Sequence, residues 1–98
     1  MPNRIDLKDI SKQAYQHICN VIDTPMSDDL RRPSERNKLS SLFNDFLKTR
    51  LSSAMDQNVP FNHRISYLGD VITAGYGLAY IHGMNLNDYI TLNVENNN

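Results

Sequence analysis

Residues 39–55 read LSSLFNDFLKTRLSSAM. Apolar side chains recur along this stretch at steps of three and four residues, the spacing that places them on one face of an α-helix. The stripe consists of Leu39, Leu42, Phe43, Phe46, Leu47, Leu51, Ala54 and Met55. Ser34 has a side chain suited to cap the helix start, and Asn58-Val59-Pro60 stops the helix. The sequence therefore predicts a long amphipathic helix over 34–57.

The same spacing marks an earlier helix. Its apolar face is formed by Leu7, Ile10, Ala14, Ile18, Val21 and Ile22. Asp6 is a suitable N-cap, and Asp9 places an acidic group at the positive end of the helix dipole. Thr24-Pro25 ends this helix, because the residue before a proline is pushed out of the helical region. We therefore predict a helix over 6–22.

A third helix is predicted over 62–82, and its apolar residues nearly surround the axis. They are Ile65, Leu68, Val71, Ile72, Ala74, Leu78, Ala79 and Ile81. Such a helix is usually covered on two sides. Gly69, Gly75 and Gly77 each cost about 1 kcal/mol relative to alanine, which is tolerable if another helix packs closely there. A kink or break near Gly75 is the alternative, and Gly83 fits the position just after the helix end.

The whole pattern predicts an all-α fold. A short helix over 86–94 and a frayed tail over 95–98 follow the third helix, and no strand pattern competes. We expect one domain over 1–98, a hairpin or bundle of two long central helices with an N-terminal helix and a short C-terminal helix. A chain of 98 residues buries only about 60–70% of its unfolded surface. Dimerisation, as a symmetric homodimer, is therefore expected to complete the core.

Composition excludes several classes of function. Ten basic and eleven acidic residues leave a net charge of −1, too weak a field to favour nucleic acid or an anionic membrane. The single cysteine, Cys19, excludes an internal disulfide and a cysteine-rich zinc site, and it fits a reducing compartment. No apolar run of signal-peptide or membrane-span character is present. We therefore expect a cytoplasmic protein without a membrane partner.

Three segments of the second half carry a family resemblance. Residues 68–72 read LGDVI, residues 79–90 read AYIHGMNLNDYI, and residues 93–96 read NVEN. They resemble the end of MazG-like all-α nucleoside triphosphate pyrophosphohydrolases, which typically read ELGDVLWYL, then LG(I/L)DLEE, then N(L/I)EK. Residues 42–48, LFNDFLK, fall where the family's Glu-Glu-x-x-Glu motif belongs. The residues at 7–14 also resemble the usual first helix of the family, more weakly.

The resemblance implies a magnesium site that this chain has largely lost. MazG-like enzymes hold Mg²⁺ with carboxylates on two facing helices and cut a nucleotide between its α- and β-phosphates. The corresponding positions are Asn44, Asp45, Lys48, Tyr67 and Asp70, of which two keep a carboxylate. Together with Asn93 they form the candidate remnant pocket. A lysine about 4 Å from the cation would repel it by about 4 kcal/mol, so the resemblance implies loss of metal-dependent hydrolysis.

Each member of this pocket also has a structural interpretation. Asp70 is either a remnant ligand or a partner for Lys48, Arg50 or Arg64 across the helix pair. Asp45 and Lys48 belong either to the pocket or to the solvated face of an amphipathic helix.

Other polar and aromatic groups also allow two interpretations. Tyr76, Tyr80 and Tyr89 are candidate interface residues, with base stacking as the alternative. The three histidines lack metal-site spacing, and Cys19 suits a packed position. The basic residues of segment 31–38 either meet phosphates or an acidic partner, or pair with the neighbouring acidic residues in a solvated loop.

Two classes of function follow. The first is a non-catalytic helical interaction and regulatory protein on a MazG-like scaffold, acting as a homodimer on an unidentified protein partner without a cofactor. The alternative is a divergent Mg²⁺-dependent pyrophosphohydrolase with Asp45 and Asp70 as metal ligands, or a metal-free pseudoenzyme that binds a nucleotide.

Overall fold

The computed structural model describes residues 3–91 and 93–94, so the predicted tail over 95–98 lies outside the described residues. The elements in chain order are β1 (Asn3–Arg4), α1 (Leu7–Val21), α2 (Pro33–Met55), α3 (Phe61–Ile81), the 3₁₀ turn η1 (Leu86–Asp88) and β2 (Asn93–Val94). The helices contain 15, 23 and 21 residues. The predicted all-α class is confirmed.

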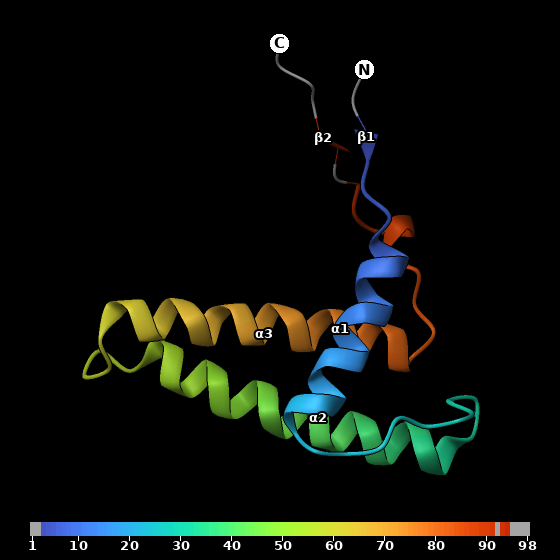
Figure 1. Cartoon of the computed structure of the whole chain (residues 1–98), viewed down its shortest axis with the longest axis horizontal. Helices are drawn as coiled ribbons and strands as arrows, with labels where there is room; N and C mark the ends of the chain where they lie inside the picture. Colours follow the sequence, from blue (N-terminus) through green and yellow to red (C-terminus); the bar gives the residue numbers. More distant parts are fainter. Residues whose placement is uncertain (1–2, 92, 95–98) are drawn as a thin grey trace.

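Helices α2 and α3 form a long antiparallel hairpin, and α1 crosses it (Figure 1). The crossing lies over the C-terminal half of α3, where Tyr15 of α1 packs against Tyr80 with 4.9 Å between ring centroids. The molecule is consequently thin, with extents of 46 × 41 × 20 Å. The end of the hairpin that joins α2 to α3 extends beyond α1.

The core lies where the three helices meet. Its buried members are Tyr15, Ile18, Cys19, Leu39, Phe43 and Ile81. Tyr15 stacks on Phe43 with ring centroids 5.9 Å apart. Cys19 is 2% exposed, and burial raises the pKa of its thiol. The interpretation of Cys19 as a small packed side chain is thus confirmed.

The capping residues named from the sequence behave as predicted, with one exception. The Asp6 side chain accepts a hydrogen bond from Lys8 N at 3.0 Å, as its N-cap role predicts. Gly83 has φ +68°, the left-handed conformation expected just after α3. The exception is α2, which starts at Pro33 rather than after a Ser34 cap. A proline has a helical φ and no N–H to satisfy, so it is favoured at the first position of a helix.

Helix α3 is continuous through its glycines, so the alternative of a break near Gly75 is wrong. The described helices include none that is both long enough and apolar enough to cross a membrane.

The segment after α3 differs from the predicted helix over 86–94. Among the described residues of this segment only the single turn Leu86–Asp88 is helical, and Asn85 caps it by accepting from Asn87 N at 3.1 Å. Asn87 then binds the start of α1: its Oδ1 accepts from Leu7 N at 3.0 Å, and its Nδ2 donates to Asp6 Oδ1 at 2.9 Å. Beyond it, β2 pairs antiparallel with β1, so the first and the last described segments lie side by side (Figure 1). Asn93 and Val94, which were predicted to be helical, thus form a strand that pairs with β1.

Candidate functional site

Asp70 of α3 faces Arg50 of α2 across the hairpin. Arg50 Nε lies 3.4 Å from Asp70 Oδ2, and each side chain is 36% exposed. The Arg50 guanidinium also lies over the Phe46 ring, 4.9 Å from its centroid, and over the Tyr67 ring at 5.6 Å. Asp70 therefore pairs with Arg50, one of the partners that the structural interpretation proposed. The Arg50 guanidinium lies where a metal ion bound by Asp70 would need to lie.

The other α2 members of the remnant pocket point elsewhere. Successive residues of a helix are rotated by about 100°, so Asp45 lies about 140° around the axis from Arg50 and Lys48 about 160°. Both side chains are exposed, as is Asn44, which matches the solvated-face interpretation. Asp45 and Asp70, the two alternative metal ligands, therefore do not point toward a common metal site.

The remaining members of that pocket are also separated. Tyr67 is half-buried beneath Arg50. Asn93 lies in β2, and its backbone pairs with Arg4 near the chain ends. Within residues 3–91 and 93–94, no three His, Cys, Asp or Glu side chains gather closely enough to hold a metal ion.

The three candidate interface tyrosines lie in different surroundings. Tyr80 is half-buried against Tyr15 and belongs to the core. Tyr76 is half-buried and lines a shallow groove between α1 and α3 together with Ile10 and His17. Tyr89 is 71% exposed. The three side chains thus lie in separate surroundings, and their role at an interface stays a prediction.

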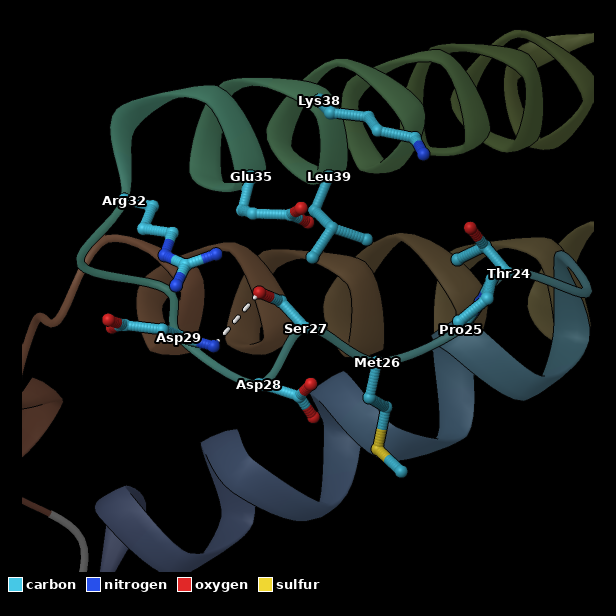
Figure 2. Close-up of a pocket in the computed structure, with 10 residues that line it drawn as sticks. All are labelled: Thr24, Pro25, Met26, Ser27, Asp28, Asp29, Arg32, Glu35, Lys38 and Leu39. Carbon is cyan, nitrogen blue, oxygen red and sulfur yellow. Dashed lines mark hydrogen bonds between the residues drawn. The ribbon is translucent and has the colours of Figure 1, made fainter.

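A cavity of about 280 Å³ lies between residues 24–29 and the first turns of α2 (Figure 2). The loop is held by Tyr15, whose hydroxyl oxygen accepts a hydrogen bond from Ser27 N at 2.9 Å. Ser27 Oγ in turn accepts from Asp29 N at 3.2 Å, the dashed line in Figure 2.

Opposed charges line this cavity. Asp28, Asp29 and Glu35 face Arg32 and Lys38 around it (Figure 2). Next to the cavity, Arg31 Nε binds Asp29 Oδ1 at 3.0 Å, and this hydrogen bond holds the pKa of Asp29 below its ordinary value. The basic residues of segment 31–38 thus lie among acidic ones, as the self-paired alternative predicts. Because acidic and basic side chains both line the cavity, its charges favour neither a bound anion nor a bound cation.

The most distinctive surface is apolar and lies on α3. Its members, which we call the α3 seam, are Phe61, Ile65, Leu68 and Ile72, with exposed fractions of 68%, 50%, 38% and 61%. They follow one another at steps of four, three and four residues, so they share one helix face. The seam occupies the half of α3 that α1 leaves uncovered (Figure 1). The prediction that two sides of this helix are covered therefore holds only for its C-terminal half.

The end of α2 also carries exposed apolar side chains. Leu51 is 40% exposed and Met55 is 72% exposed, and both lie in the last two turns of α2. We call these two residues together with the α3 seam the hairpin patch. Each of its six large side chains is exposed by more than a third.

Surplus apolar surface could be anticipated from the sequence, but its location could not. The four-three-four spacing of apolar residues at the start of α3, together with the short length of α1, would indicate where this surface lies. A helix of 15 residues is only about 22 Å long, and it crosses the hairpin rather than lying along it.

No family model, curated protein or solved structure matches this chain. The MazG-like resemblance therefore stays a prediction.

Proposed function

We propose that the protein is a non-catalytic interaction and regulatory protein that acts as a homodimer on a protein partner. The hairpin patch carries this proposal. Exposed apolar patches of this extent mark interaction sites, because leaving them in water forgoes about 25 cal/mol for each Å² that a partner would cover.

The size of the patch suits an obligate or stable partner. A standard interface takes about 800 Å² from each side, of which little more than half is apolar. Six large apolar side chains that are 38–72% exposed, with a polar rim, can supply the apolar part of such an interface. The rim includes Arg64, whose guanidinium lies 5.6 Å from the centroid of the Phe61 ring. Arginine over an aromatic ring is common at interfaces.

Enzymatic and nucleotide-binding alternatives receive less support. Metal-dependent pyrophosphate release requires converging carboxylates, whereas Asp70 is engaged by Arg50 and Asp45 is exposed on another side of α2. We propose that the scaffold is MazG-like without the metal chemistry, that no cofactor is used, and that the buried free thiol of Cys19 suits the reducing cytoplasm.

The first test is the oligomeric state of the full chain. Sedimentation velocity over a wide concentration range should show a reversible dimer. Ile65→Asp should weaken it at least about tenfold, since burying one unpaired charge costs more than 1.4 kcal/mol. Val21→Asp is the matched control, because Val21 is 49% exposed and Ile65 is 50% exposed, but Val21 lies outside the hairpin patch.

Two outcomes would overturn the proposal. A chain that stays monomeric at every concentration removes the homodimer. A thermal shift that needs both Mg²⁺ and a nucleotide, abolished by Asp70→Asn but kept by Asp9→Asn on the exposed side of α1, would restore the enzyme alternative, because only a ligand that binds the folded state raises its stability.

A further inference from the structure

Two glycines of α3 have no packing role within the protomer. A Cβ atom at Gly69 or at Gly75 would meet no described atom within 4 Å. Gly77 differs, because a Cβ there would lie 2.5 Å from Phe43 Cε2. An interior helical glycine is destabilising by about 1 kcal/mol relative to alanine. The core explains Gly77, but nothing that the structure describes explains the other two.

Gly75 continues the α3 seam. Phe61, Ile65, Leu68, Ile72 and Gly75 alternate steps of four and three residues, the a/d spacing of a coiled-coil seam. The next position in this series, Ala79, is only 6% exposed, so the open seam ends at Gly75. The open part spans two heptads, about 21 Å. It has a large side chain at one end and none at the other.

The two ends of the seam are symmetric in position about its centre. Phe61 and Gly75 each lie seven residues from Leu68, while Ile65 and Ile72 lie three before it and four after it. An antiparallel copy centred on Leu68 would therefore set Phe61 against Gly75 and Leu68 against itself, with Ile65 and Ile72 of the two copies offset by one residue from direct opposition. A parallel copy would set Phe61 against Phe61 and leave a void between two glycines, and voids and overpacking are both destabilising.

We propose that α3 pairs antiparallel with α3 of a second copy around a two-fold axis at Leu68, with Phe61 of each copy seated over the partner's Gly75. This arrangement rests on the homodimer proposed above and specifies its geometry. Gly69 lies about 100° from Leu68 around the α3 axis, so it is not part of this contact.

The surroundings of Gly75 suit an incoming aromatic ring. Ile72 and Tyr76, on either side of Gly75 in the chain, line the shallow groove of about 380 Å³ between α1 and α3, together with Thr73 of α3 and Ile10, Gln13, Ala14 and His17 of α1. The open space at Gly75 itself leaves room for the Phe61 ring of a second copy. Seating Phe61 there buries its exposed 68%, and buried aromatic anchors dominate the binding energy of interfaces.

Cysteine cross-linking tests the register in the full chain. In a Cys19→Ala background, Leu68→Cys should form a covalent dimer with itself under mild oxidation. Phe61→Cys and Gly75→Cys should each remain uncoupled alone and should couple when mixed, because a disulfide requires Cα atoms within about 7 Å. Ser66→Cys is the control, since it is exposed and lies about 120° from the seam at Ile72 around the α3 axis.

The outcomes separate this proposal from the one on which it rests. Coupling of Phe61→Cys with itself would show a parallel pair. A dimer in sedimentation that couples at Ser66→Cys, or that fails to couple at Leu68→Cys and in the mixed pair, would overturn the register and leave the homodimer standing. A monomer in sedimentation would overturn both.

Discussion

Phe43 of α2 lies directly against the backbone of α3 at Gly77. A Cβ atom at Gly77 would lie 2.5 Å from Phe43 Cε2 and 3.4 Å from Tyr15 Cα, and Phe43 itself is fully buried. The absence of a side chain at this one position lets three helices meet around the ring. Helix α3 therefore uses its glycines in two ways, because the positions at Gly69 and Gly75 stay open within the protomer.

Alanine substitutions should distinguish these two uses by their sign. Gly77→Ala should lower the free energy of unfolding by about 1–2 kcal/mol, since overpacking costs more than the gain in helix propensity. Gly69→Ala should raise it by up to about 1 kcal/mol, because its new methyl group meets open space. Urea unfolding at a concentration where the chain is monomeric measures both changes. Equal effects would show that Phe43 moves aside freely.

Replacing the charges of the Arg50–Asp70 pair should have a small effect on stability. Half-exposed ion pairs contribute about 1 kcal/mol or less, so Asp70→Asn should lower the free energy of unfolding by no more than that. A double-mutant cycle with Arg50→Gln should show a coupling of a few tenths of a kcal/mol. Asp45→Asn is the exposed control and should change nothing. A loss of several kcal/mol in Asp70→Asn would mean that Asp70 has a role beyond this pair.

The helices could be predicted from the sequence because their signals are local. The spacing of apolar residues, the Asp6 cap and the left-handed Gly83 each depend on a few neighbouring residues, and each is found where expected. The segment over 86–94 has helical spacing at Leu86 and Ile90, yet it turns away after one turn. Its conformation depends on Asn87 binding Asp6 and Leu7 at the opposite end of the chain. Patterns of neighbouring residues cannot predict this contact, because its partners are 80 and 81 residues apart in the sequence.

The candidate pocket could not be predicted because it depends on helix rotation. The apolar stripe of α2 is broad, and a shift of one residue turns the facing side by about 100°. Placing Asp45 toward α3 fits the family motif, whereas the structure turns Arg50 toward α3 instead. Phe43 decides the rotation, because burying its ring against Gly77 fixes which residues of α2 face the hairpin interior. That choice needs the third helix, which the periodicity of α2 does not describe.

Stability should fall in alkaline solution. Burial raises the pKa of the Cys19 thiol above its ordinary value of 9.0 and that of the Tyr15 phenol above 10.0. Between the ordinary and raised values these groups ionise only in the unfolded chain, which drives unfolding. The free energy of unfolding should be unaffected by these groups below pH 9 and should decline above it. Urea titrations across this range measure the slope.

A variant separates the thiol from other alkaline effects. Cys19→Ala should be less stable overall, because a buried side chain is shortened. It should nevertheless lose less stability than the parent chain on going from pH 9 to pH 10. An identical slope in both proteins would contradict a raised thiol pKa.

A size swap across the proposed two-fold axis gives the sharpest test of the α3 pair. Phe61→Ala removes the side chain that fills the partner's Gly75 position, and Gly75→Phe sets two rings against each other. Each change should weaken the dimer at least about tenfold, because a lost aromatic anchor or an overpacked contact costs 1–3 kcal/mol or more. The combined variant again sets a large residue against a small one at both ends of the seam. It should recover most of the lost affinity.

The recovery is specific to an antiparallel register. In a parallel pair, the combined variant would set the two introduced phenylalanine rings against each other and the two introduced alanine side chains against each other, so the two losses would add. Dissociation constants from sedimentation equilibrium for the parent, both single variants and the combined variant give the coupling energy directly. A coupling energy near zero would contradict the antiparallel register, even if every variant remained dimeric. Ser66→Ala, on another side of α3, should leave all four constants unchanged.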